Sequence, residues 1–426
     1  MRGMAEKGLS TIFHRCPQQN STLIRGVLRF TRKLINLGRR CAKTLGDTMR
    51  VAIDLTALLP KATGVDTYLK HLVIHLGQID HDNRYVIFMN YEDRRLFDGM
   101  LPQNFAVLPL CLRPRPARLL FQQMGVPAAA RALGSEVVHS PSFLMPFYRG
   151  RHRHLLTVYD MTFFSLPHCH TPLRRSTPFR RMVSWSIRHA DLISVPSRAT
   201  QQGILDLMPG VLPERIRVIR PGIGAEFRPE ALGKVQAEIR RLGALWPYIL
   251  YVGTIEPRKN LQRLVESYRQ LIAGGEIDEH LVLAGPLGWD AEALLGQVDV
   301  PELRDRVHLL GYMPQSDLPW LYRGAKVFVY PSLQEGFGFP PLEAMACGVP
   351  TIASLSSSLA ENLQGAAELV PPTDGEALTW AMRRLLRDEH LRAERREQGL
   401  ARAAQFRWQE TAQQTLRCYQ DLAAGG

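Results

Sequence analysis

Two glutamates, Glu335 and Glu343, frame a loop that contains two glycines. Gly336 and Gly338 stand on either side of Phe337, after an apolar run and before a pair of prolines. Glycines let a backbone approach a ligand closely, and the free N–H groups at the start of a helix favour an anion, most often phosphate. Carboxylates instead accept hydrogen bonds from hydroxyl groups. The combination suits a sugar that is joined to a nucleoside through a diphosphate.

A second candidate anion site spans residues 253–260, with the sequence Gly-Thr-Ile-Glu-Pro-Arg-Lys-Asn. It follows a predicted strand and opens a predicted helix, a position that favours anion binding. Arg258 and Lys259 add positive charge where a diphosphate would lie. A departing nucleoside diphosphate gains negative charge as the glycosidic bond breaks, so a fixed cation there stabilises the transition state more than the ground state. We therefore expect both cations to act in catalysis.

The elements that must position these residues alternate between strand and helix. A first alternating set runs from a strand at 51–55 to a strand at 216–219, and a second begins with a strand at 248–253. Between them, the prolines and glycines of residues 220–229 interrupt the pattern. This alternation predicts an α/β fold with two Rossmann-like, doubly wound parallel sheets. Ligands of such folds bind at the carboxyl ends of the strands, here in a cleft between the two domains.

Residues 335–350, Glu-Gly-Phe-Gly-Phe-Pro-Pro-Leu-Glu-Ala-Met-Ala-Cys-Gly-Val-Pro, resemble the signature of retaining GT-B glycosyltransferases of the family-4 type, the glycosyl transferases group 1. The resemblance implies that Glu335 contacts the donor sugar and that Glu343 contacts the ribose. It also implies that the amides of the loop, at Gly336, Phe337 and Gly338, contact the diphosphate.

The segment that begins at Gly253 resembles a second motif of the same family, G-x-x-x-x-R-K. The resemblance implies that Lys259 contacts the diphosphate. Thr254 stands where many relatives carry an arginine, so the phosphate clamp is expected to rest on Arg258 and Lys259 alone.

Three residues of the first half match the family more loosely. Gly64 lies in a loop that resembles one lining the donor phosphate and acceptor side, although Val65 and Asp66 replace two of its residues. The resemblance implies that His139 binds a hydroxyl of the donor sugar; a purely structural histidine is the alternative. Asp160 resembles a strand-end aspartate and either contacts the acceptor or caps a turn.

The resemblance implies a GT-B fold with a C-terminal helix that crosses back to the first domain. We assign residues 1–48 to a basic extension, 49–228 to an acceptor domain, 229–410 to a nucleotide-sugar domain and 411–426 to the returning helix. It also implies transfer of a mannose- or glucose-type hexose from a GDP- or UDP-sugar to a glycan or lipid-linked saccharide. A nucleotide-sugar 2-epimerase and a non-catalytic sugar-nucleotide-binding subunit are the alternatives.

We expect neither a cofactor nor a metal ion. Asp80 and Asp82 match the D-x-D pattern of metal-dependent glycosyltransferases, but they lie in a polar turn between a helix and a strand. The histidine pairs 152/154 and 168/170 have no further ligand residues nearby in the sequence, which a metal site would need.

The net charge of +13 is concentrated at the start of the chain. Residues 1–50 hold 11 Lys or Arg and 2 Asp or Glu, a net +9, which leaves +4 for the rest. Apolar residues at helical spacing over 23–35 alternate with arginines, a pattern typical of a membrane-surface helix. There are two alternatives: the segment is a disordered basic arm, or the natural protein starts at Met49. Six scattered cysteines indicate a cytoplasmic protein, peripheral at most at the inner face of a membrane, and we expect no nucleic-acid partner.

Overall fold

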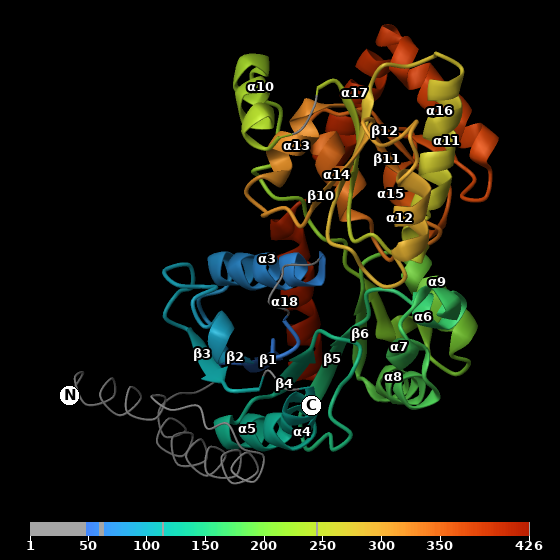
Figure 1. Cartoon of the computed structure of the whole chain (residues 1–426). Coiled ribbons are helices and arrows are strands. Elements are labelled where there is room, and N and C mark those ends of the chain that lie inside the picture. Colours follow the sequence, from blue (N-terminus) through green and yellow to red (C-terminus); the bar gives the residue numbers. More distant parts are fainter. Residues whose placement is uncertain (1–47, 59–63, 113–114, 244–245, 426) are drawn as a thin grey trace. The chain divides into compact units, whose positions relative to one another are not determined.

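The computed structural model describes residues 48–58, 64–112, 115–243 and 246–425 (Figure 1). The chain forms two α/β parts, each built on a parallel sheet. By packing, it divides into two compact units. Of the described residues, the first unit comprises those up to Thr157, His189–Ile193 and those from Thr415 onward, and the second comprises those of Val158–Arg188 and Ser194–Gln414. The predicted class, two α/β parts on parallel sheets, is confirmed.

A seven-stranded sheet has the order β3-β2-β1-β4-β5-β6-β7, in which β1 pairs in parallel with both β2 and β4. β1 is buried from its second residue to its last, as its apolar sequence requires. The strands are β1 (Arg50–Asp54), β2 (Arg84–Asn90), β3 (Phe105–Leu110), β4 (Val137–Ser140), β5 (Arg153–Thr157), β6 (Leu192–Val195) and β7 (Ile216–Val218). The helices between them are α3 (Gly64–Ile79), α4 (Arg115–Leu120), α5 (Val126–Leu133), α6 (Thr162–Ser165), α7 (Pro172–Arg175), α8 (Thr177–His189) and α9 (Arg198–Leu207).

One helix of this part is less regular than the sequence predicts. Residues 117–133 read as a single helix, but α4 and α5 are joined by a π-helical turn over Phe121–Gly125. A Cβ at Gly125 would lie 2.2 Å from the Phe121 ring, so the ring fills the space that a larger residue would need. The absence of a side chain at Gly125 therefore leaves room for the Phe121 ring within this turn, a local detail that periodicity does not report.

The six-stranded sheet has the order β10-β9-β8-β11-β12-β13. Its central strands β8 and β11 are almost wholly apolar, and nearly all of their side chains are buried. The strands are β8 (Tyr248–Val252), β9 (His280–Ala284), β10 (Val307–Gly311), β11 (Ala325–Tyr330), β12 (Thr351–Ser354) and β13 (Glu368–Val370). The helices are α10 (Leu232–Arg241), α11 (Leu261–Ala273), α12 (Glu292–Val298), α13 (Leu318–Gly324), α14 (Phe339–Ala346), α15 (Ser357–Leu363), α16 (Gly375–Arg387), α17 (Glu389–Ala403) and α18 (Trp408–Ala424).

The division by packing places part of the first half of the chain in the second unit. Segments 158–188 and 194–228 pack with the second unit, because they contact the loop after β11 and helix α15. Glu361 of α15, for example, accepts hydrogen bonds from the N–H groups of Arg198 and Ala199, both at 3.1 Å, at the start of α9. The end of α18, from Thr415 onward, belongs to the first unit.

Candidate active site

Side chains from other segments hold the loop between β11 and α14 by hydrogen bonds to its backbone carbonyl groups. The hydroxyls of Ser357 and Ser358 donate to the backbone carbonyl of Glu335 at 3.0 and 2.9 Å. The Thr200 hydroxyl donates to the carbonyl of Gly336 at 3.3 Å, and the Asn362 amide donates to the carbonyl of Phe337 at 2.9 Å. By contrast, the N–H groups of residues 336–338 donate to no protein acceptor within the described residues. Anchored carbonyls and unused amides give this loop the character of an anion-binding site.

Glycine is required at two positions of the same loop. A Cβ at Gly336 would lie 1.9 Å from the carbonyl oxygen of Tyr159, so the two backbones meet without room for a side chain. Gly338 has φ +90°, in the left-handed region that favours glycine, and it precedes the first turn of α14. Pro340 and Pro341 occupy that first turn, where a missing N–H costs little.

Glu335 lies at the centre of a buried cluster of charges. Lys259 Nζ donates to Glu335 Oε1 at 2.5 Å and to the Tyr330 hydroxyl at 2.7 Å. Arg258 Nη1 lies 2.8 Å from Glu335 Oε2, and its Nη2 lies 2.8 Å from Glu256 Oε1. The side chains of Glu335, Lys259 and Arg258 are only 9–13% exposed. The structure therefore brings Glu335, predicted to contact the donor sugar, together with the two cations that we expect to act in catalysis.

The charges set the protonation of this cluster. Burial opposes ionisation of Glu335, but the charges of Arg258 and Lys259 outweigh it and hold the pKa of Glu335 at about 2. Burial lowers the pKa of Lys259, and Arg258 lowers it further, while Glu335 and Glu256 oppose that shift. Glu335 is thus a carboxylate throughout the neutral range.

The residues at the end of β8 shape the turn that carries the two cations. Gly253 has φ +150°, and its N–H donates to the carbonyl of Ala284 at 2.9 Å. The carbonyl of Thr254 accepts a hydrogen bond from the Tyr251 hydroxyl at 3.2 Å. The Arg258 carbonyl accepts from the N–H of Leu333 at 2.9 Å, which ties this turn to the loop after β11. Gly253 and Thr254 therefore support the site through the backbone.

Glu343 has different surroundings from Glu335. It is 6% exposed on α14, and the Tyr322 hydroxyl donates to its Oε2 at 2.8 Å. Burial raises the pKa of Glu343 to about 7, and the hydrogen bond from Tyr322 offsets part of that rise. The nearby charge of Glu226 also favours the protonated form. Glu343 is therefore a carboxyl group that titrates near neutral pH.

Asp160 lies beside the glycine loop in the second unit. A Cβ at Gly336 would be 2.9 Å from the Asp160 Cβ, and the Asp160 charge acts on Arg258. One carboxylate oxygen accepts from the N–H (2.9 Å) and the hydroxyl (2.6 Å) of Thr162, at the start of α6. Asp160 thus caps a turn and also lies at the edge of the charged cluster.

The two other predicted residues belong to the first unit. His139 is fully buried, and its ring nitrogens bond to the hydroxyls of Tyr419 and Thr157, both at 2.8 Å. Burial lowers the pKa of His139 to about 3, so the ring is neutral. These are the surroundings of a core histidine, with neither nitrogen left for a sugar. Gly64 is exposed as the first residue of α3.

The rejected D-x-D pair has a structural role in the α3–β2 turn. Asp80 accepts hydrogen bonds from the backbone of Asp82 and Asn83 at 3.1 Å and from the Tyr85 hydroxyl at 2.5 Å. The described residues contain no group of three or more His, Cys, Asp or Glu arranged to hold a metal ion. No helix among them is both long and apolar enough to span a bilayer. The predicted basic helix within 1–48 lies almost wholly outside the described residues.

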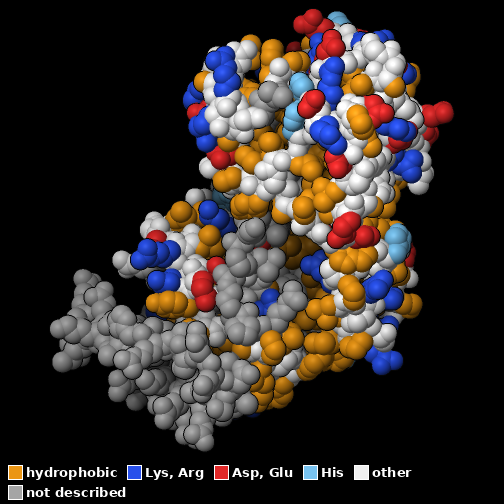
Figure 2. All heavy atoms as spheres, viewed as in Figure 1, with side chains coloured by type: hydrophobic (Ala, Val, Ile, Leu, Met, Phe, Trp, Pro, Cys, Tyr) orange, Lys and Arg blue, Asp and Glu red, His pale blue; other side chains and the backbone are white. Residues whose placement is uncertain are grey.

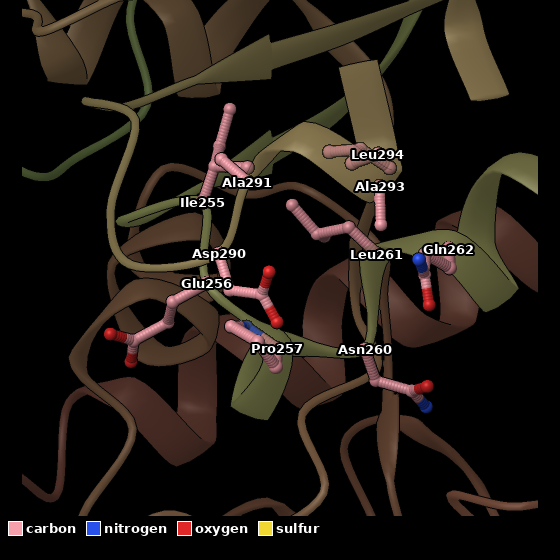
Figure 3. Close-up of a pocket in the computed structure, with 10 residues that line it drawn as sticks. All are labelled: Ile255, Glu256, Pro257, Asn260, Leu261, Gln262, Asp290, Ala291, Ala293 and Leu294. Atoms are coloured by element: carbon pink, nitrogen blue, oxygen red, sulfur yellow. The ribbon is translucent and has the colours of Figure 1, made fainter. Parts of the chain in front are cut away.

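A small cavity of about 120 Å³ adjoins the turn that carries the cations. Figure 3 shows the carboxylates of Glu256 and Asp290 on one side of it and the apolar side chains of Ile255, Leu261 and Leu294 on the other. Sites for ligands of drug size typically occupy about 300 Å³ or more. This cavity alone is therefore too small for a nucleotide sugar.

Sequence reasoning missed the residues that hold the loop in place. Ser357, Ser358, Asn362 and Thr200 are ordinary polar residues on helices, and no spacing marks them as partners of residues 335–337. Tyr330 ends the apolar strand before the loop, and its hydroxyl accepts from Lys259 and donates to Glu335 at 3.1 Å. Its position directly before the loop was the one available signal.

Comparisons with known proteins identify the family of this chain. Residues 245–402 match the sequence model of glycosyl transferases group 1, and residues 62–227 match that of glycosyltransferase family 4. The chain is 32% identical over 380 residues to the O-antigen chain mannosyltransferase B of Escherichia coli, covering 84% of this chain and 96% of the relative.

Two solved structures show the same fold. One is sucrose-phosphate synthase from Thermosynechococcus elongatus, with a TM-score of 0.71 and 22% identity, covering 89% of this chain and all of that one. The other is Anabaena HepE in complex with UDP-glucose, with a TM-score of 0.70 and 17% identity, covering 88% of this chain and all of that one. Together with the match to the Escherichia coli relative along almost its whole length, these findings show that the chain belongs to the group 1 glycosyltransferases and is a glycosyltransferase of the GT-B fold.

Proposed function

We propose that this chain transfers a mannose- or glucose-type hexose, with retention of anomeric configuration and without a metal ion, from a GDP- or UDP-sugar to a glycan or lipid-linked saccharide. The observation that carries the proposal is the contact of Glu335 with Lys259 and Arg258 beside a loop whose amides are unused. The relative in Escherichia coli is named a mannosyltransferase of O-antigen chains, and the Anabaena neighbour holds UDP-glucose, which supports a sugar nucleotide as donor.

Lys259 has a donor to spare for the diphosphate. An ammonium group has three N–H donors, and Glu335 and Tyr330 take two of them. The third can reach a diphosphate oxygen while the amides of residues 336–338 bind other oxygens of the same group. These fixed donors would stabilise the negative charge of the leaving nucleoside diphosphate, the task that a metal ion performs in other transferases.

Glu335 acts as a carboxylate in this proposal. A pKa of about 2 leaves it no proton to give at neutral pH, so it does not protonate the leaving group. Instead it accepts hydrogen bonds from hydroxyls of the donor sugar and stabilises the positive charge that develops on the ring as the glycosidic bond breaks. The leaving phosphate oxygen takes the proton of the acceptor hydroxyl, which attacks from the same face and so retains configuration.

The proposal can be tested with a panel of GDP- and UDP-sugars and a lipid-linked oligosaccharide acceptor, in excess chelator. Transfer should occur from one mannose- or glucose-type donor, and nuclear magnetic resonance of the product should show the anomeric configuration of the donor. An inverted product, or activity that is lost in chelator and restored by Mg²⁺ or Mn²⁺, would contradict it.

The same experiment separates the alternatives. A 2-epimerase would release epimerised sugar without an acceptor. A binding subunit would bind the donor, as read by thermal shift, but release no nucleoside diphosphate.

A further inference from the structure

The Arg258 guanidinium is almost fully used by the protein itself. Its Nη1 contacts Glu335 Oε2 at 2.8 Å and the Gln334 carbonyl at 2.9 Å, and its Nη2 contacts Glu256 Oε1 at 2.8 Å. Its Nε is buried without a hydrogen-bond partner in the described part of the chain. The side chain is 13% exposed. Arg258 therefore links one carboxylate to another and has few donors to offer a diphosphate.

Glu256 fixes the orientation of the planar Arg258 guanidinium. A guanidinium presents its donors in a rigid plane, so a carboxylate bound at Nη2 determines where Nη1 points. Glu256 lies two residues before Arg258, just ahead of the short 3-10 turn Pro257–Lys259, and its side chain is 24% exposed. Charges then alternate along a chain of contacts, from Glu256 to Arg258, Glu335 and Lys259.

A third carboxylate, that of Asp160, also acts on this guanidinium through its charge. Its negative charge acts on Arg258 alongside those of Glu335 and Glu256. Without the Glu256 carboxylate, Nη2 has no hydrogen-bond partner among the described residues, and the guanidinium is free to turn relative to Glu335. A displaced guanidinium would leave Lys259 and Tyr330 as the remaining contacts of the Glu335 carboxylate in the described residues.

We propose that Glu256 is a positioning residue for the transfer reaction, which acts through Arg258 to hold the Glu335 carboxylate against the donor sugar. The inference rests on the proposed function. Glu256 needs no contact with the donor in this role, because the diphosphate is bound by Lys259 and the loop amides. Its effect should therefore fall on turnover rather than on nucleotide affinity.

The test is a double-mutant cycle on the full chain with Glu256→Gln and Arg258→Gln. Glu256→Gln should lower kcat by about 10- to 100-fold, because small misplacements of a catalytic group cost that much. Affinity for GDP and UDP should change less than about twofold. In the Arg258→Gln background, Glu256→Gln should have no further effect on kcat. Glu276→Gln, which removes a carboxylate paired with Arg383 elsewhere in the same unit, is the matched control.

Two results would overturn the proposal. One is that the effects of the two substitutions multiply, because Glu256 would then act by another route. The other is a crystal structure of Glu256→Gln in which the 2.8 Å contact between Arg258 and Glu335 is unchanged. This second readout needs no activity. Failure of the unmodified chain to transfer sugar from any donor would instead count against the proposed function.

Discussion

At the scale of single residues, the two glutamates of the site differ in what surrounds them. Glu335 faces two cations, whereas Glu343 faces a tyrosine hydroxyl and a more distant carboxylate. Their pKa values are accordingly pushed apart, to about 2 and about 7. Such separation is typical of functional sites, where each carboxyl group needs one protonation state. Only Glu343 can change its charge near neutral pH.

Glu343 should make the stability of the chain depend on pH. Its folded pKa of about 7 lies above the unfolded value of about 4.3. The protonated group therefore contributes stability that is complete below about pH 4 and lost as the pH rises through 7, by roughly 3 kcal/mol. Denaturant unfolding at pH 5 and pH 8 should show this loss in the unmodified chain and not in Glu343→Gln.

The same variant reports on the role of Glu343. If its carboxylate accepts a hydrogen bond from the ribose, Glu343→Gln should weaken nucleotide binding at pH 8 by about 10- to 150-fold, the worth of one hydrogen bond to a charged group. A variant that gained stability at pH 8 but bound GDP and UDP as tightly as before would show that Glu343 is only a core residue.

At the scale of elements, the site depends on contacts between segments far apart in the sequence. The strand, loop and prolines of residues 325–341 follow from local patterns, and so does the turn that carries Arg258 and Lys259. The anchoring of the loop by α15 and α9 does not, because hydroxyl and amide donors bond carbonyls without any fixed spacing. His139 is a similar case: the Tyr419 hydroxyl that occupies one of its ring nitrogens is 280 residues away.

Gly336→Ala tests whether the loop must lie against the backbone of Tyr159. The added methyl group would sit 1.9 Å from the Tyr159 oxygen, so the loop has to move. We expect activity to fall by about 100-fold or more, since shifts near 1 Å have that effect, while circular dichroism stays unchanged. Gly233→Ala in α10 is the control, because nothing lies within 4 Å of its added Cβ. Equal activity of the two variants would show that the loop tolerates displacement.

At the scale of the whole molecule, the positive charge is unevenly divided. Figure 2 shows acidic and basic side chains interspersed over the described part of this face, in keeping with a net +4 for residues 51–426. The remaining +9 belongs to residues 1–50. Composition alone identified this asymmetry, and the alternation of elements identified both sheets. The grouping of residues 158–188 with the second unit was not predicted, since it depends on packing rather than on chain order.

Removal of residues 1–48 tests the role of that charge. If the segment binds a membrane surface, the shortened chain should lose most of its co-sedimentation with anionic vesicles at low salt, because each basic residue near such a surface contributes about 1 kcal/mol. Neutral vesicles serve as the control. Equal binding of the full and shortened chains to anionic vesicles would locate any membrane contact elsewhere.

The central claim is that Lys259 and the amides of residues 336–338 bind one diphosphate. A crystal structure of the chain with GDP or UDP tests it most directly. We predict that Lys259 Nζ and at least one of these N–H groups lie within about 3 Å of oxygens of the same diphosphate. A diphosphate bound away from both, with Lys259 still committed to Glu335 and Tyr330 alone, would contradict the account.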